Sequence, residues 1–286
     1  MPVSVVTDSV SSIPVQDARD LGIEVVSLYV DDGETNRAEV EMDVSDFYRR
    51  LVTMKKLPTS SQPSVESLFT AFRTAVERGS DVVGVFISQK MSGTYDTAIM
   101  AAEMVRKDHP AARIEIIDSA SNSFQEGFAV IAAAKAARAG ETLERCVQAA
   151  LDTMSRTRFL FTPASLDNLR RGGRIGGASA LIGGLLQIRP ILTVEDGETQ
   201  TFMKVRTPGR ALSEMARTFA EDVAAHGLVQ VVVHFIGDSE PAEKFAAEYI
   251  EPIAGGPVRV LPVSAVVGLH VGQSVAVVYQ TERKLR

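Results

Sequence analysis

The first half of the chain alternates short apolar runs with segments of helical spacing. The apolar runs stand at residues 3–7, 23–30, 81–88 and 113–118. Their length and their content of valine and isoleucine are typical of buried strands. The segments with helical spacing stand at residues 15–22, 44–53, 65–79, 97–107 and about 125–140. Nearly continuous apolar strands that alternate with helices predict a mainly parallel sheet with helices on both faces.

The second half has a different pattern. A strand is predicted at TRFLFTPAS and is followed by a glycine-punctuated helical region, LDNLRRGGRIGGASALIGGLLQI. Two further strand-like runs flank Asp196-Gly197, a strong signal for a hairpin. A helix at 211–226, a strand at 229–236, a helix at 241–250 and strands at 258–263 and 274–280 complete the chain. The pattern predicts a second α/β domain with a mixed sheet. We therefore expect two α/β domains, 1–156 and 157–286, with the boundary near Arg156.

Composition and charge narrow the class of protein. The chain has 286 residues, 45% of them hydrophobic, and a formal net charge of −6, which disfavours a general nucleic-acid binder. Because no run approaches 18 apolar residues, no integral membrane segment is expected. The opening MPVSVVTDS has neither a charged region nor a long apolar region of a signal peptide. A cytoplasmic location is therefore the expectation.

Several common catalytic signals are absent from the sequence. It has no G-x-x-x-x-G-K-[ST] phosphate loop, no G-x-S-x-G elbow, no H-E-x-x-H pair and no cysteine zinc pattern. Its single cysteine, Cys146, stands in a helical pattern and is expected to be a buried structural thiol. We therefore expect no cofactor and no metal site, and ATP chemistry by this chain alone is disfavoured.

A serine–glycine–threonine turn joins a predicted strand to a predicted helix. In MSGTYDTA, Ser92, Gly93 and Thr94 stand at the start of that helix. A helix N-terminus has unpaired N–H groups and the positive end of the helix dipole, so it attracts anions. The alternative is ordinary capping, because serine and threonine are favoured there in any case.

Two other polar segments are candidates for the same site. Thr59 and Ser60 stand in the hydroxyl-rich loop LPTSSQPS, whose alternative interpretation is a polar turn that caps a helix. Asp8 and Ser9 follow the first strand, where capping is the commonest explanation and lining a cleft is the rival. Ligands bind at the carboxyl ends of parallel strands, which is where Asp8, Ser9 and Ser92 are predicted to lie.

Arginines and histidines supply the remaining candidates. Arg170, Arg171 and Arg174 cluster in LRRGGRIGG, where guanidinium groups suit carboxylate or phosphate. The alternative interpretation is a solvated basic turn. His270, in VVGLHVGQS, is predicted to lie in a loop between strands and to face a ligand. The other histidines are explained structurally: His109 and His226 stand at helix ends, and His234 stands in an apolar strand as a core histidine.

Taken together, the residues predict a two-domain α/β protein that binds a small anion. Five segments, in this order, resemble the DegV family: VTDSVSSIP, PTSSQPS, ISQKMSGTYDTA, LDNLRRGGRI followed by RPIL, and GLHVGQSVAVVY. DegV proteins are bacterial fatty-acid-binding proteins that present their substrate to a fatty acid kinase. The resemblance spans nearly the whole chain.

The resemblance implies a ligand, partners and residue roles. The ligand would be a long-chain, palmitate-like fatty acid, with its tail in an apolar tunnel and its carboxylate near the domain interface. The partners would be an ATP-dependent fatty acid kinase subunit and an acyl-phosphate acyltransferase of phospholipid synthesis. The protein itself would not be an enzyme. The positions that match the family's motifs are Thr59 or Ser60, and Ser92 with its turn neighbours Gly93 and Thr94. These residues would bind the carboxylate, with Thr59 or Ser60 and Ser92 as hydrogen-bond partners. His270 would order that network, Arg170 or Arg174 would assist the acyl phosphate or the kinase, and Asp8 and Ser9 would be head-group or partner contacts.

The sequence departs from the family in the last segment. Where the family commonly has G-T-H-T-G-P-G-A, this chain has Leu269 and Val271 beside the histidine, and Gln273 and Ser274 after the second glycine. Two alternatives therefore stay open. One is a hydrolase or a phospho-ligand enzyme that uses Ser92 with His270, and the other is a carrier of a different anionic lipid.

Overall fold

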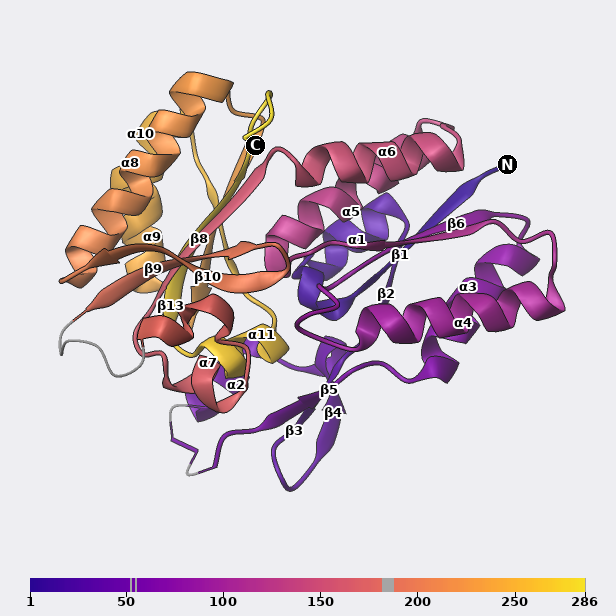
Figure 1. The fold of residues 1–286 in the computed structure, drawn as a ribbon, viewed down its shortest axis with the longest axis horizontal. Helices are drawn as coiled ribbons and strands as arrows, with labels where there is room; N and C mark the ends of the chain where they lie inside the picture. Colours follow the sequence, from indigo (N-terminus) through magenta and orange to yellow (C-terminus); the bar gives the residue numbers. More distant parts are fainter. Residues whose placement is uncertain (52, 55, 182–187, 286) are drawn as a thin grey trace. The chain divides into compact units, whose positions relative to one another are not determined.

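The computed structural model describes all residues except 52, 55, 182–187 and 286 (Figure 1). The chain divides into two compact units. Unit 1 comprises Met1–Met42 and Ser60–Met154, and unit 2 comprises Asp43–Thr59 and Ser155–Arg286. Each unit has its own main sheet.

Unit 1 contains a four-stranded sheet in the order β2-β1-β6-β7. All three neighbouring pairs are parallel, with β1 and β6 in the middle. The strands are β1 (Val3–Asp8), β2 (Ile23–Val26), β6 (Asp81–Phe86) and β7 (Ile114–Asp118). The short apolar runs of the first half therefore form the predicted parallel sheet.

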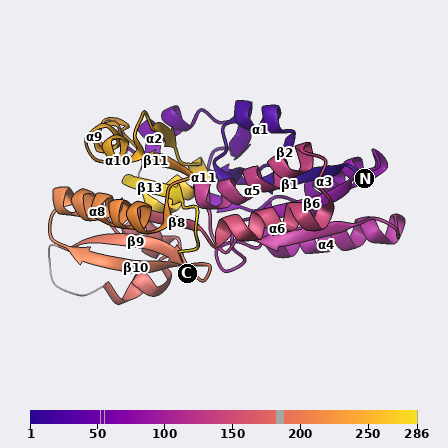
Figure 2. The ribbon, with the colours of Figure 1, turned by 90° about the horizontal axis from the view of Figure 1, so that it is seen from above.

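Helices cover both faces of this sheet, as predicted (Figures 1 and 2). One face carries α3 (Val65–Glu77) and α4 (Thr94–Asp108), which pack on each other and on the strands. The other face carries α1 (Val15–Leu21), α5 (Ser123–Arg138) and α6 (Leu143–Met154). Phe72 of α3 meets Phe86 of β6 edge to face, 6.3 Å between ring centroids, in the core under α3 and α4. Cys146 is buried on α6, as expected of a structural thiol.

The apolar run at 23–30, predicted as one strand, is two. β2 ends at Val26, and β3 (Tyr29–Asp31) pairs antiparallel with β4 (Asn36–Ala38). Together with β5 (Thr59–Ser61) they form a second, small sheet of order β4-β3-β5. Hydroxyl groups satisfy the backbone where the run breaks. The Leu28 N–H donates to Ser9 Oγ at 2.9 Å, and the Val40 N–H donates to Ser27 Oγ at 3.2 Å. The Leu28 N–H thus bonds a side chain instead of a neighbouring strand, and the strand ends before it.

Unit 2 contains a six-stranded sheet in the order β10-β9-β8-β13-β11-β12. β11 and β12 are parallel and the other pairs are antiparallel, which confirms the predicted mixed sheet. Asp196 (φ 51°) and Gly197 (φ 80°) make the predicted hairpin between β9 and β10. The strands are β8 (Thr157–Pro163), β9 (Arg189–Glu195), β10 (Glu198–Val205), β11 (Gln230–Ile236), β12 (Arg259–Pro262) and β13 (Ser274–Gln280).

The helices of unit 2 differ from the prediction in detail. The helix predicted from residue 211 starts earlier, at Pro208, because Thr207 caps it by accepting the Arg210 N–H at 3.2 Å. The helix predicted at 241–250 is α9 (Glu240–Phe245), a π-helical turn (Ala246–Ile250) and α10 (Glu251–Ala254). The glycine-punctuated region gives α7 (Asp167–Arg171) and a 3-10 helix (Gly176–Leu181), and its residues 182–187 lie outside the described residues. The helix that Thr207 caps is α8 (Pro208–His226).

Helix α2 (Val44–Leu51) comes early in the chain but packs in unit 2, against α11 (Ala265–Val271). The Tyr48 hydroxyl donates to the Val263 carbonyl at 2.7 Å, and its ring lies where a Cβ on Gly268 would stand, 2.4 Å away. The compact units therefore interleave along the chain, whereas one boundary near Arg156 was expected. The division into domains 1–156 and 157–286 stays a prediction.

Candidate functional site

The carboxyl end of β1 is tied to the carboxyl end of β6 by Asp8. This carboxylate is wholly buried and accepts the Val10 N–H at 3.0 Å and the Ile87 N–H at 2.9 Å. The first bond caps the 3-10 turn after β1, and the second holds the segment that follows β6. The neighbouring Ser9 donates to Glu39, so its hydroxyl is also used within the protein. A contact of Asp8 or Ser9 with a head group or partner stays a prediction.

A second carboxyl group lies buried beside Asp8. Glu126 of α5 is wholly buried and accepts the Thr7 hydroxyl at 3.3 Å. Burial raises the pKa of Asp8 to about 7, with the negative charge of Glu39 adding to the effect. Burial also raises the pKa of Glu126 well above its ordinary value, and the charge of Asp8 adds to it. At this end of the sheet, Asp8 and Glu126 therefore keep their protons at pH values at which exposed carboxyl groups have lost theirs.

The turn after β6 places two hydroxyl groups at the start of α4, where the sequence predicts them. The Ser92 N–H donates to the Ser88 carbonyl at 3.1 Å, which closes the turn, and Gly93 precedes the first helical residue, Thr94. The Ser92 and Thr94 hydroxyls lie 2.9 Å apart and hydrogen-bond each other. Thr94 is buried and Ser92 is half-buried. The pair offers neutral donors at a helix N-terminus, which suits an anionic group.

Gln62 links the hydroxyl-rich loop to this turn. Its Nε2 donates to Thr97 Oγ1 at 2.6 Å, and the Thr97 hydroxyl donates to the Gly93 carbonyl at 2.9 Å. The amide lies against Gly93, where a Cβ would stand 2.1 Å from Gln62 Oε1. Sequence reasoning included Gln62 in the loop but assigned it no role. Its loop neighbours differ in setting: Ser60 is half-buried in unit 1, and Thr59 is exposed in unit 2.

The contact between Gly93 and Gln62 makes a testable prediction. Gly93→Ala is expected to displace the Gln62 amide and to lower the free energy of unfolding by about 1 kcal/mol, because the glycine backbone (φ −73°) accepts alanine but the added methyl group clashes. Chemical denaturation would measure the change in both the wild-type and the Gln62→Ala background. An equal cost of Gly93→Ala in the two backgrounds would contradict the contact.

In unit 2, His270 lies on a helix and not in the predicted loop. The prediction is wrong because Ser264 caps α11 by accepting the Val267 N–H at 3.3 Å, so the helix begins before the glycines. Gly272, at φ 73°, then ends it. The glycines of VVGLHVGQS therefore lie within and after one short helix, and His270 belongs to its last turn.

A glycine and an arginine from the turn after α7 surround the imidazole of His270. A Cβ on Gly172 would stand 2.3 Å from His270 Nδ1, so the missing side chain leaves the space that the ring needs. Arg174 donates to the Gly172 carbonyl at 2.6 Å. Burial lowers the pKa of His270 to about 4, and the positive charge of Arg174 adds to this. His270 is therefore neutral at physiological pH.

The remaining candidates are Arg170 and the other three histidines, of which His109 lies in unit 1. Arg170 is exposed and pairs with Asp167 at 3.6 Å along α7, a pair that contributes little to stability. Asn168, which sequence reasoning passed over, donates to the Leu269 carbonyl at 3.1 Å and so joins α7 to α11. His234 is a buried core histidine on β11, as predicted, with its Nδ1 3.0 Å from the Leu261 carbonyl oxygen. His109 and His226 stand at helix ends, also as predicted.

Known proteins match this chain over nearly its whole length. A family model described as "Uncharacterised protein, DegV family" matches residues 2–282. The chain belongs to the DegV family. A DegV domain-containing protein of Clostridium acetobutylicum is 41% identical over the whole of both chains.

Solved DegV structures share the fold. A stearic acid-binding protein from Eubacterium ventriosum is 26% identical, with a TM-score of 0.89 over 98% of each chain. A DegV protein from Thermus thermophilus, described by its fatty acid binding, is 29% identical, with a TM-score of 0.85 over 98% of this chain and 100% of that one. The predicted family and fold class are thereby confirmed.

The departures from the DegV pattern have structural consequences in this chain. Leu269 and Val271, which replace the threonines beside His270, are both buried on α11. Gln273 is exposed and lies against Gly237, and Ser274 is buried at the start of β13. The apolar pair holds α11 by packing, and neither side chain offers a hydroxyl group to His270. Within the part of the chain that the structure describes, no helix has the length and apolar character to cross a membrane.

Proposed function

We propose that this DegV protein binds a long-chain fatty acid and presents its carboxylate to a partner fatty acid kinase. The observation that carries the proposal is the likeness, over 98% of the chain, to two solved DegV proteins described as fatty-acid-binding. The Ser92–Thr94 hydroxyl pair at the start of α4 supports it, because such donors suit a carboxylate. In the proposal, the protein is a cytoplasmic, non-catalytic carrier.

Affinity and orientation come from different parts of the ligand. Burial of an acyl tail yields about 0.8 kcal/mol per methylene, so a palmitate-like tail offers on the order of 10 kcal/mol before the cost of association. Ser92 and Thr94 are neutral donors, as are Thr59 and Ser60, and they orient the carboxylate without the strength of an ion pair. Weak head-group bonds suit a ligand that must react and leave.

The basic residues of unit 2 have a separate role in the proposal. His270 is neutral, so it can donate or accept one hydrogen bond and can order the carboxylate network. Arg174, which is exposed next to His270, or the exposed Arg170 would stabilise the negative charge of an acyl phosphate or contact the kinase. The kinase supplies ATP, the carboxylate oxygen attacks the γ-phosphorus, and ADP leaves. The acyl phosphate then passes to an acyltransferase of phospholipid synthesis.

A reconstitution tests the kinase half of the proposal. Purified protein loaded with palmitate is incubated with a bacterial fatty acid kinase subunit and ATP, and acyl phosphate is trapped with hydroxylamine. Acyl phosphate should form when both proteins are present and should fall at least tenfold with Arg174→Ala, while Arg145→Ala, on the exposed face of α6, serves as the matched control. Formation at the same rate without this chain would contradict the proposal. Ester hydrolysis by this chain alone, abolished by Ser92→Ala, would favour the hydrolase alternative.

A further inference from the structure

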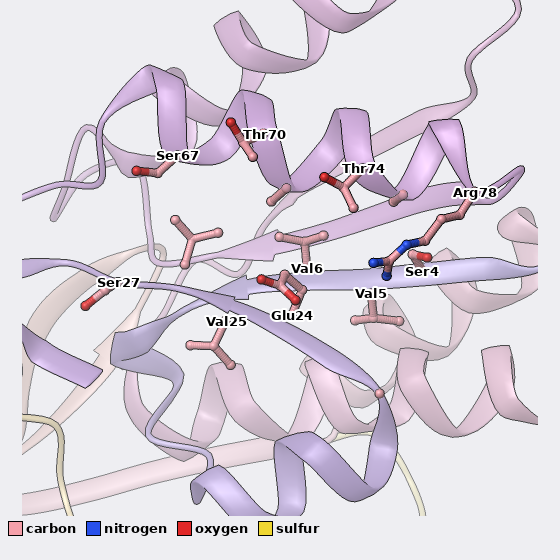
Figure 3. Close-up of a pocket in the computed structure, with 14 residues that line it drawn as sticks. Ser4, Val5, Val6, Glu24, Val25, Ser27, Ser67, Thr70, Thr74 and Arg78 are labelled. Atoms are coloured by element: carbon pink, nitrogen blue, oxygen red, sulfur yellow. The ribbon is translucent and has the colours of Figure 1, made fainter. Parts of the chain in front are cut away.

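A cavity of about 460 Å³ lies in unit 1 between the edge strand β2 and helix α3 (Figure 3). Its volume is in the range of small-molecule sites. None of its lining residues belongs to the turn at Ser92 or to the loop at Ser60, so the proposed head-group site does not account for it. The lining comes from β1, β2 and α3, with the segments beside them.

The cavity exists because one stripe of α3 carries short side chains. Leu68 and Phe72 face the core of the sheet. The adjacent stripe, which overhangs β1 and β2, consists of small and hydroxyl-bearing residues and ends in an arginine. Larger residues at these positions would fill the space above the sheet edge. The stripe comprises Ser67, Thr70, Ala71, Thr74, Ala75 and Arg78.

The sheet side of the cavity combines an apolar floor with a carboxylate. Val6 and Val26 pack in the core under α3, and side chains alternate along a strand, so Ser4 and Glu24 face the same way. In Figure 3, Glu24 and the Arg78 guanidinium point toward each other from opposite walls at one end of the cavity. Among the described residues no ion pair joins them, which leaves both charges available to a ligand.

We propose that this cavity binds a free α-amino acid. The guanidinium of Arg78 would take the α-carboxylate and Glu24 would take the α-ammonium group, since these opposite charges face each other at one end. The amino-acid side chain would then run along α3 over Val6 and Val26, with the hydroxyls of Thr70 and Thr74 beside it. A fatty acid would use only one of the two charges, because a carboxylate with a bare tail has no cationic group for Glu24.

Ligand binding by the purified protein tests the proposal. The twenty free amino acids are screened one at a time by thermal shift, and those that stabilise the protein are titrated by calorimetry. At least one is expected to bind, and Arg78→Ala and Glu24→Ala are each expected to weaken it at least tenfold. Arg73→Ala, on the same helix but outside the cavity, is the matched control. The methyl ester and the N-acetyl derivative of the same amino acid should also bind at least tenfold more weakly.

Two outcomes would overturn the proposal. One is that none of the twenty amino acids binds at concentrations up to about 10 mM. Any binding free energy would then be less favourable than about −3 kcal/mol. The other is that binding persists unchanged in both cavity variants. Fatty acid binding measured on the same variants keeps the two sites separate, since Arg78→Ala and Glu24→Ala should leave it at the wild-type level.

Discussion

The free energy of unfolding is expected to fall as the pH rises from about 4 to about 7. Asp8 is wholly buried and its pKa is about 7, against an ordinary value of 3.8, so the folded protein holds a proton that the unfolded chain releases. Where the folded state binds the additional proton, stability falls by up to about 1.4 kcal/mol per pH unit. Over the window between the two pKa values, the loss is on the order of 4 kcal/mol. Chemical denaturation at a series of pH values measures it.

A variant of Glu126 separates this effect from general charge effects. Glu126→Gln keeps the shape of the side chain but carries no titratable proton, so it removes that group's own titration, while its amide can still donate a hydrogen bond to Asp8. We expect the decline with pH to become shallower, and the variant to be more stable than the wild type at pH 8 by about 1–3 kcal/mol. Glu103→Gln, at an exposed position of α4, should keep the wild-type slope. A stability that rises between about pH 4 and about pH 7 would contradict the account.

Gly172→Ala is expected to displace the His270 ring from its buried position. The backbone at Gly172 (φ −75°) accepts alanine, but the new Cβ would stand 2.3 Å from His270 Nδ1 and 3.2 Å from the Asn168 carbonyl oxygen. Expulsion of the ring should cost about 1–3 kcal/mol of stability and weaken fatty acid binding about tenfold or more. Because an expelled ring regains solvent, its pKa should rise from about 4 toward 6.5, which NMR titration measures directly.

The control for this variant is another glycine on the same unit. Gly209 has open space where a Cβ would stand, so Gly209→Ala should leave the His270 pKa and fatty acid binding unchanged. His270→Ala combined with Gly172→Ala should be no less stable than His270→Ala alone, since the clash is gone. A Gly172→Ala protein whose His270 still titrates near pH 4 would show that the ring keeps its place, contrary to the prediction.

The parts of the fold that the sequence predicts well are those with strong local signals. The apolar runs of the first half, the turn at Ser92 and the hairpin at Asp196-Gly197 all lie where their patterns place them. Each of these features depends on a few adjacent residues, so contacts with distant parts of the chain do not alter the structure that the pattern predicts. The break of the run 23–30 was not predictable in this way, because its cause is the Ser9 hydroxyl, far away in sequence.

Of the three misses at the candidate site, one is local and two have the same distant origin. The glycines around His270 favoured a loop, yet the capping hydroxyl of Ser264 starts a helix there. Glu126 stands in a helix that is otherwise apolar, and the sequence gives no sign that its carboxyl group is buried beside Asp8. Gln62 acquires its role only through contact with Gly93, which lies 31 positions further along the chain. Contacts between distant segments decide the roles of Glu126 and Gln62, and periodicity does not encode such contacts.

The central claim is that this chain carries a fatty acid held at its head group by the turn after β6. Native mass spectrometry of protein purified from bacterial cells, followed by denaturing extraction of the ligand, tests it most directly. We predict one fatty acid of defined length per chain in the wild type and in Ser239→Ala, a serine that makes no capping bond. Ser92→Ala should lose the ligand. A protein that is purified empty and also fails to bind added fatty acids would contradict the account.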